Sequence, residues 1–256
     1  MILCLDIGNT QIFGGVYKNE QLRLSFRYDS TSTSTSDQLG VFLKSVLHEN
    51  YIEPTSIKKI AIGSVVPSID YSIRSACIKY FNIEPFMLSA SSPMPLTIKT
   101  EHPHELGADL IATAIGAMRR YPQQNVIIAD FGTATTFAVI TASREYLGTV
   151  ILAGMRLSMQ ALGSNTAKLF PVEIVKPTHV IGKNTTCSVQ SGLYYGHLGI
   201  VREMIERITK EAFSKEASPI TLGTGGFVHM FESEALFTAI IPNLVLEGLL
   251  YSVESL

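Results

Sequence analysis

The feature that most constrains how this chain can fold is an apolar run ending in Asp-x-Gly, because the pattern occurs twice. In its second occurrence, residues 126–129 predict a buried strand, and residues 135–140, rich in β-branched side chains, predict a strand that returns beside it. Asp130, Gly132 and Thr133 lie in the turn between them. The glycine lets the backbone approach a ligand closely, and N–H groups in such turns bind anions such as phosphate. The pattern therefore predicts a hairpin whose tip can hold a phosphate group.

The same pattern opens the chain, where residues 2–5 are apolar, residues 6–10 form the turn and residues 11–17 return. A fainter similarity follows in the same order, between residues 60–64 and 220–224. One such turn alone would favour an unrelated hairpin. Two in the same order and context favour a duplicated domain with one phosphate-binding hairpin per half. A shift of 124 positions aligns Asp6 with Asp130, Gly8 with Gly132, Asn9 with Thr133 and Phe13 with Phe137.

Composition indicates a globular chain with a large core, since 46% of its 256 residues are hydrophobic and only 16% are charged. A chain of this length can bury about three quarters of its unfolded surface. The net charge of −2 gives no reason to expect a nucleic-acid or membrane partner. Cys4, Cys77 and Cys187 show no C-x-x-C spacing, and neither a signal peptide nor a membrane-spanning run is found. We therefore expect a cytoplasmic protein.

Hydrophobic periodicity and breaker residues predict two similar series of elements, β-β-β-α-β-α-β and α-β-β-β-α-α-β-α. The polar residues 89–100 join them, and residues 30–36, all Ser or Thr, are expected to form a loop. An α/β fold follows, with a domain at residues 1–100 and another at residues 101–256. The predicted strands are 2–5, 11–17, 21–27, 59–64, 85–88, 126–129, 135–140, 145–152 and 219–223, and the predicted helices are 37–49, 67–81, 108–120, 154–169, 185–210, 227–235 and 243–252.

Six short motifs are spread, in order, over nearly the whole chain. They are Asp6-Ile7-Gly8-Asn9-Thr10, Ser64-Val65-Val66-Pro67, Gly107-Ala108-Asp109, Asp130-Phe131-Gly132-Thr133-Ala134-Thr135-Thr136, Gly182-Lys183-Asn184-Thr185 and Gly223-Thr224-Gly225-Gly226. Together they resemble the motifs of the type III pantothenate kinases, and the paired Asp-x-Gly turns resemble the ATPase fold of sugar kinases, actin and heat-shock chaperones. The resemblance implies duplicated ribonuclease H-like, or actin-like ATPase, domains with a central nucleotide cleft.

The resemblance implies a reaction and a set of roles. The γ-phosphoryl group of ATP would move to the primary hydroxyl of pantothenate, giving 4'-phosphopantothenate in the first step of coenzyme A biosynthesis. The family uses Mg²⁺ with ATP and a monovalent cation, K⁺ or NH₄⁺, and forms a homodimer. Asp109 would be the catalytic base and Asp130 the ligand of the monovalent cation. The implied ATP contacts are Asp6, Ile7, Gly8, Asn9, Thr10, Gln11, Ile12, Phe13 and Thr133, and the implied pantothenate contacts are Gly107, Ala108, Asp109, Leu110 and Thr185.

Residue chemistry alone gives simpler interpretations of the same positions. Asp6 would accept backbone hydrogen bonds in a β-turn, and Asp109 and Thr185 would be N-caps of the helices that follow them. Two acceptor positions also depart from the family, which usually has arginine where this chain has Leu110 and often tyrosine where it has Thr100. A kinase of another small hydroxyl compound, or a non-catalytic nucleotide-binding regulator, therefore remains open as an alternative.

Overall fold

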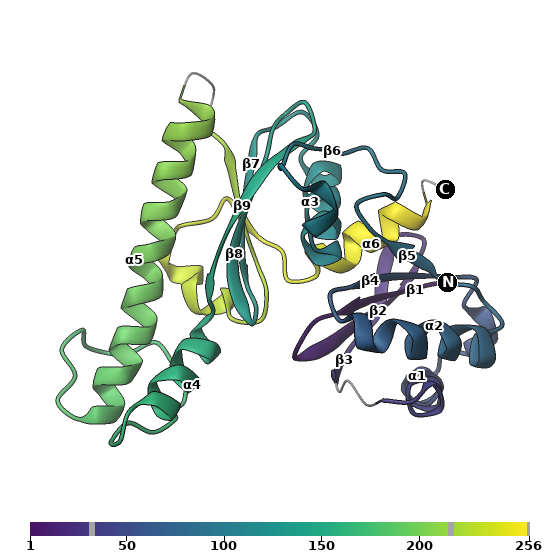
Figure 1. Ribbon diagram of the computed structural model, residues 1–256, viewed down its shortest axis with the longest axis horizontal. Coiled ribbons are helices and arrows are strands. Elements are labelled where there is room, and N and C mark those ends of the chain that lie inside the picture. The colour runs from purple at the N-terminus through teal and green to yellow at the C-terminus, as the bar shows by residue number, and fades with distance from the viewer. Residues whose placement is uncertain (31–33, 215–217, 255–256) are drawn as a thin grey trace. The chain divides into compact units, whose positions relative to one another are not determined.

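The computed structural model describes residues 1–30, 34–214 and 218–254 (Figure 1). The chain forms two compact units, Met1–Arg120 with Leu244–Leu256 (unit 1) and Tyr121–Asn243 (unit 2). These bounds differ from the halves expected from the sequence, 1–100 and 101–256, because α3 (Ala108–Arg120) and α6 (Leu244–Glu254) pack on each other within unit 1. The halves themselves remain a prediction about duplication. Part of the expected loop, residues 31–33, lies outside the described residues.

Unit 1 contains a mixed sheet in the strand order β3-β2-β1-β4-β5. The strand β2 runs antiparallel to both β1 and β3, whereas β4 runs parallel to β1 and to β5. Short turns are enough to join the antiparallel strands. The parallel strands need longer crossover connections, which contain the helices. The strands are β1 (Ile2–Ile7), β2 (Gln11–Lys18), β3 (Gln21–Asp29), β4 (Lys59–Ser64) and β5 (Phe86–Leu88).

Helices cover both faces of this sheet. Figure 1 shows α1 (Ser36–Glu49) and α2 (Pro67–Phe81) on one face and α6 on the other. Alternate residues of β1 point into the α1–α2 side, where Leu3, Leu5 and Ile7 are fully buried. The shorter elements of unit 1 are η1 (Pro54–Ser56), β6 (Thr97–Ile98) and η2 (Pro103–Glu105).

Unit 2 repeats the topology of unit 1, which confirms the duplicated fold. Its strands follow the order β9-β8-β7-β10-β11, in which β7 is antiparallel to β8 and parallel to β10. The place of β1 in unit 1 is thus taken by β7, and that of β4 by β10. The strands are β7 (Val126–Phe131), β8 (Ala134–Ile140), β9 (Glu145–Ala153), β10 (Ile220–Thr224) and β11 (Ala239–Ile240).

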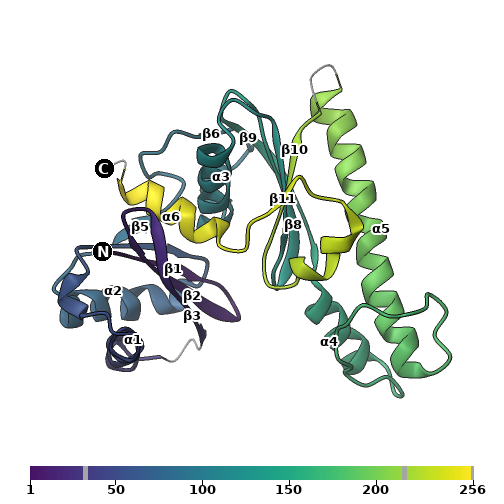
Figure 2. The ribbon, with the colours of Figure 1, turned by 180° about the vertical axis from the view of Figure 1, so that it is seen from behind.

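The helices of unit 2 are α4 (Met155–Asn165), the long α5 (Thr185–Phe213) and the 3-10 helix η3 (Val228–Glu234). Figure 2 shows α5 running the length of the unit beside its sheet. Buried side chains of α5 join those of β7 and β8 in one core cluster, so the helix is fixed by its apolar face. Within the described residues, no helix is both long and apolar enough to cross a bilayer.

The two hairpin turns differ by one residue, which corrects one expected equivalence. In the first turn the Gly8 N–H donates to the Gln11 carbonyl at 3.0 Å, whereas in the second the Gly132 N–H donates to the Ala134 carbonyl at 3.0 Å. Because the second turn is shorter, the strand that follows it is shifted by one position. Asp6 therefore lies opposite Phe13 but Asp130 lies opposite Thr136, and the predicted equivalence of Phe13 and Phe137 is wrong.

Candidate active site

The first hairpin turn is a compact loop that exposes polar groups at the end of β1. A β-carbon on Gly8 would lie 3.2 Å from the Gln11 carbonyl oxygen, so glycine suits the tight closure here. Asn9 and Thr10 are exposed, and Asp6 is partly buried. Asn9 and Thr10 are thus accessible to a ligand at this turn, and binding of ATP here stays a prediction.

Two side chains of the expected ATP-binding segment point to the face of the sheet opposite to that of Asp6. The side chains of Ile7 and Ile12 are 0% and 3% exposed and belong to the core cluster beneath α1 and α2. Only their backbone groups can contact a nucleotide. The strand alternation explains this, because side chains on either side of Asp6 point to the opposite face of the sheet.

Asp109 lies inside the first turn of α3 and does not cap it. The helix begins at Ala108, and the Ile111 N–H donates to the Gly107 carbonyl at 3.1 Å, which places the cap position before Ala108. The N-cap interpretation of Asp109 is therefore wrong. Its carboxylate instead accepts the Leu110 N–H at 2.8 Å. A β-carbon on Gly107 would overlap this carboxylate oxygen, so the glycine leaves room for it.

Burial raises the pKa of the Asp109 carboxyl group above its usual value of 3.8, while the backbone hydrogen bond from Leu110 acts in the opposite direction. Burial dominates because the charged carboxylate loses hydration that the backbone N–H donors do not replace. A carboxylate with a raised pKa is a stronger proton acceptor than an exposed aspartate. The local structure thus gives Asp109 the property that a general base requires.

Asp109 and Asp6 lie at the same end of the unit 1 sheet. Asp6 pairs with Gly63 across the β1–β4 ladder. The β-carbon of Ala108 lies 3.7 Å from where a β-carbon on Gly63 would stand, so the start of α3 lies on the strand beside Asp6. Segments about a hundred residues apart in sequence are therefore brought together here.

The second hairpin turn, in unit 2, lies against two further glycine segments. A β-carbon on Gly225, whose φ is +88°, would overlap a carboxylate oxygen of Asp130. The Gly154 N–H donates to the Thr133 carbonyl at 3.1 Å, while the remainder of Thr133 is exposed. The turn is therefore held from two sides and presents Thr133 outward.

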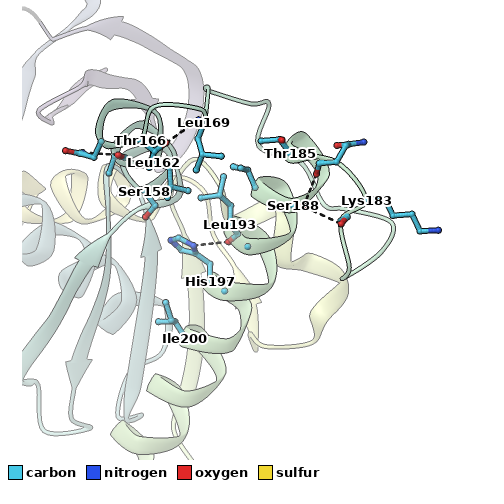
Figure 3. A pocket seen from close by; sticks show the side chains of 17 residues that line it. Ser158, Leu162, Thr166, Leu169, Lys183, Thr185, Ser188, Leu193, His197 and Ile200 are labelled. Atoms are coloured by element: carbon cyan, nitrogen blue, oxygen red, sulfur yellow. Dashed lines mark hydrogen bonds between the residues drawn. The ribbon is translucent and has the colours of Figure 1, made fainter.

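Thr185 is the first residue of α5, and Asn184 is the cap, because its side-chain oxygen accepts the Cys187 N–H at 2.8 Å. The N-cap interpretation of Thr185 is therefore wrong, and its hydroxyl is not used to start the helix. Thr185 lies at the rim of a cavity of about 1090 Å³ inside unit 2 (Figure 3). Apolar side chains of α4 and α5, including Leu162 and Leu193, line most of it.

His197, which the sequence did not single out, also lines this cavity (Figure 3). It is 5% exposed, and its ring nitrogens lie 3.0 Å from the Leu193 carbonyl and 3.3 Å from the Ala153 carbonyl. The side chain ties α5 to the end of β9, next to Gly154. A lone histidine on an apolar helix carries no motif, so no sequence signal marked it.

The described residues contain no group of three or more His, Cys, Asp or Glu side chains that could hold a metal ion. A cation bound here would need single carboxylates together with backbone oxygens or ligand oxygens. Asp6 and Asp130 offer such carboxylates, one in each unit.

Comparison with known proteins gives one consistent result. The family model described as "Type III pantothenate kinase" matches residues 2–207. A type III pantothenate kinase of Legionella pneumophila (strain Corby) is 53% identical over 249 residues, which cover 97% of this chain and 96% of the relative.

Solved structures share the fold at much lower identity. A Campylobacter jejuni protein described as a Baf family transcriptional activator aligns with a TM-score of 0.59 at 16% identity, covering 99% of this chain and 98% of its own. A ROK hexokinase from Thermus thermophilus aligns with a TM-score of 0.50 at 13% identity, covering 100% and 99%. At such identities the likeness speaks for the actin-like ATPase fold alone.

Proposed function

We propose the roles of individual residues from one premise, which is that this chain belongs to the type III pantothenate kinase family. It is an ATP-dependent enzyme that phosphorylates pantothenate in coenzyme A biosynthesis. Membership of the family favours pantothenate over the two alternatives that the departures at Thr100 and Leu110 left open.

Asp109 is the catalytic base, and the observation that carries this assignment is its position at the start of α3, next to the strand that pairs with Asp6. Its burial, which raises the pKa of the carboxyl group, supports the assignment. The pantothenate hydroxyl would donate to the free carboxylate oxygen. As its oxygen bonds to the γ-phosphorus and the bond to the ADP oxygen breaks, the proton passes to Asp109. Phosphoryl transfer of this kind depends mainly on positioning and charge neutralisation, so one well-placed carboxylate suffices.

The first hairpin binds the ATP phosphates. The Gly8 region offers backbone N–H groups and the Thr10 hydroxyl, and Gly8 allows close approach. The Asp6 carboxylate is the hard oxygen donor that Mg²⁺ prefers, so the residues present fit a magnesium–nucleotide complex. Magnesium bound there would neutralise phosphate charge.

In unit 2, Asp130 is proposed to bind K⁺ or NH₄⁺, and Thr133 to contact ATP. The carboxylate of Asp130 lies against the backbone of Gly225, and Thr133 is exposed on the same turn. Carboxylate and carbonyl oxygens are suitable donors for a monovalent cation, so the donor chemistry of this turn fits such an ion.

For the acceptor, we propose contacts from the segment Gly107 to Leu110 and from Thr185. The hydroxyl oxygen of Thr100 is buried and has no hydrogen-bond partner among the described residues, so it could pair with a polar group of pantothenate. Leu110 cannot pair with the pantothenate carboxylate. Lys183, two residues before Thr185, is exposed and is a candidate for that charge.

We further propose a homodimer formed through unit 2. Large apolar side chains of this unit remain exposed around the cavity, on α4 and on the segment that leads to α5. Surfaces of this kind mark interaction sites in soluble proteins. The residues are Leu157, Leu162, Phe170, Val180 and Ile181. A cytoplasmic location is also proposed, because the donor ATP is a cytoplasmic nucleotide.

The variant Asp109→Asn tests the catalytic assignment, since it keeps the shape of the side chain and removes the basic oxygen. Turnover should fall by a factor of about a hundred or more, the usual size of general-base catalysis. ATP affinity should stay within about twofold of the wild type. Turnover near the wild-type value would contradict the assignment.

A further inference from the structure

An arginine on the edge strand of unit 1 lies in line with the phosphate-binding hairpin. Asp6 pairs with Phe13 across β1 and β2, and Phe13 pairs with Arg27 across β2 and β3. Directly paired residues of neighbouring strands point to the same face of a sheet. Asp6, Phe13 and Arg27 therefore form one lateral row on the face opposite α1 and α2.

The exposed Arg27 side chain lies along this row. Its guanidinium carbon lies 4.1 Å from the centroid of the Phe13 ring, a cation–π contact, and Phe13 is only 8% exposed. The guanidinium therefore leans from β3 across β2, toward the strand that carries Asp6. Stacking on a ring face leaves the N–H groups at the edge of the guanidinium able to donate to a ligand.

Among the described residues, Arg27 has the Phe13 ring as a cation–π partner but no carboxylate partner. Arg27 forms no salt bridge and no side-chain hydrogen bond with them, although Asp29 lies two residues away on the same strand face. Arg27 and Asp29 line a polar hollow of about 450 Å³ together with Gln11 and Tyr28. The backbone carbonyl of Gln11 closes the hairpin turn, so the hollow lies next to that turn.

We propose that Arg27 binds the terminal phosphate of ATP during phosphoryl transfer, which rests on the proposed binding of ATP at residues 6–13. The carboxylates of Asp6 and Asp109 at this end of the sheet repel a phosphate chain, and a cation in the same row offsets that repulsion. An arginine fork matches the geometry of phosphate oxygens and stabilises charge that develops in the transition state. Because Arg27 lies in the same lateral row as Asp6, we assign it to the phosphate nearest Asp6.

The test measures ATP, ADP and AMP affinity by titration calorimetry, and steady-state kinetics, for Arg27→Met. ATP affinity should fall by about tenfold to a hundredfold, the range for a lost charge-assisted hydrogen bond, and kcat should fall as well. AMP affinity and the KM for pantothenate should not change. Arg27→Lys keeps the charge but not the planar stack, and should give an intermediate ATP affinity.

Arg23→Met is the matched control. Arg23 is exposed on the same strand about 13 Å away, and its replacement removes the same charge. It should change ATP affinity by less than about twofold. An equal loss of ATP affinity in both variants would show that Arg27 acts only through its general charge, and would overturn the proposal. A rise in the KM for pantothenate alone would also overturn it, since Arg27 would then contact the acceptor.

Amide hydrogen exchange separates this proposal from the assignment on which it rests. ATP should slow exchange at the turn amides of residues 8–11 in the wild type. If protection appears there and Arg27→Met binds ATP normally, the Arg27 proposal alone fails. If no protection appears, ATP does not bind at this hairpin and both proposals fail.

Discussion

At the scale of single residues, the proposed chemistry depends on a largely buried carboxylate, that of Asp109. The Asp109 carboxylate accepts a hydrogen bond from the Leu110 N–H and loses most of its hydration. A group in this position is useful for catalysis and costly for folding, because the folded state disfavours its charged form.

This cost predicts how stability changes with pH in Asp109→Asn. The folded-state pKa is raised, so the penalty is present above that pKa and disappears as pH falls below the unfolded value near 3.8. The variant should therefore melt at a higher temperature than the wild type at pH 7. The gain should shrink as the pH approaches 4, which calorimetry at several pH values would measure.

Asp37→Asn is the matched control for the direction of the change in melting temperature. The hydrogen bond from Lys79 lowers the pKa of the exposed Asp37, so its charge stabilises the fold above the unfolded pKa. Its replacement should lower the melting temperature at pH 7, and the loss should diminish in acid. A gain in the control, or a loss in Asp109→Asn at pH 7, would contradict these directions.

A second prediction at this scale concerns Asp130→Ala. If this carboxylate binds the monovalent cation, activity should fall sharply and should no longer rise when K⁺ or NH₄⁺ replaces a larger cation. Nucleotide affinity should also weaken, since Thr133 lies on the same turn. A wild-type enzyme that ignores monovalent cations would show that the assignment of Asp130 is wrong.

Motif residues could be located from the sequence because the Asp-x-Gly turn has a local signature, whereas Arg27 and His197 could not. The position of Arg27 depends on the register of β1, β2 and β3, and that of His197 on the Ala153 carbonyl from another element. Neither relation is encoded by spacing along the chain. The cap interpretations of Asp109 and Thr185 failed because each residue lies just inside its helix.

At the scale of elements, unit 1 depends on the close approach of α3 and α6. A β-carbon on Gly248 would overlap the Ala112 carbonyl, and one on Gly116 would lie 2.6 Å from the Leu244 carbonyl. The two helices are therefore in backbone contact. Arg120 and Glu247 add a pair of hydrogen bonds at 2.6 and 2.7 Å between the same helices. This contact holds the helix that carries Asp109.

Gly248→Ala should destabilise the protein by about 1 to 3 kcal/mol or more, because the added methyl group forces the two backbones apart. Gly199→Ala is the control, since Gly199 is an exposed α5 residue with open space around its would-be β-carbon. That change should stabilise by up to about 1 kcal/mol through helix propensity. Chemical denaturation measures both, and equal effects would contradict the close contact.

Long periodic elements were predictable to within a few residues, and α3 was predicted with its observed bounds. The errors fall on short or irregular segments. The two-residue strands β6 and β11 carry no alternation, and the predicted helix at 227–235 is the 3-10 helix η3. The predicted helix at 154–169 ends at Asn165, because the backbone of Thr166 is extended, with φ −133° and ψ 143°.

At the scale of the whole molecule, exposed apolar side chains of unit 2 predict a dimer. Sedimentation at micromolar concentration should show a species of twice 28.0 kDa. Ile181→Asp should shift the population toward the monomer, because Ile181 is 82% exposed on the proposed surface. Tyr71→Asp, at an 80% exposed tyrosine of unit 1, should not. Only a 28.0 kDa wild-type species would contradict the dimer.

The order of six motifs was enough to assign the family, since each motif is weak but the series spans nearly the whole chain. The division into compact units could not be predicted in the same way. The C-terminal α6 belongs to unit 1 because of its contacts with α3, and residues more than a hundred positions apart make those contacts.

The most direct measurement is ADP release by the purified protein with ATP, Mg²⁺ and K⁺, with and without pantothenate, together with mass analysis of the product. ADP should appear only when pantothenate is present, in equal amount to 4'-phosphopantothenate, and Asp109→Asn should lower the rate of both by about a hundredfold or more. ADP release that is independent of pantothenate, or equal turnover of another hydroxyl compound in its place, would contradict the assignment.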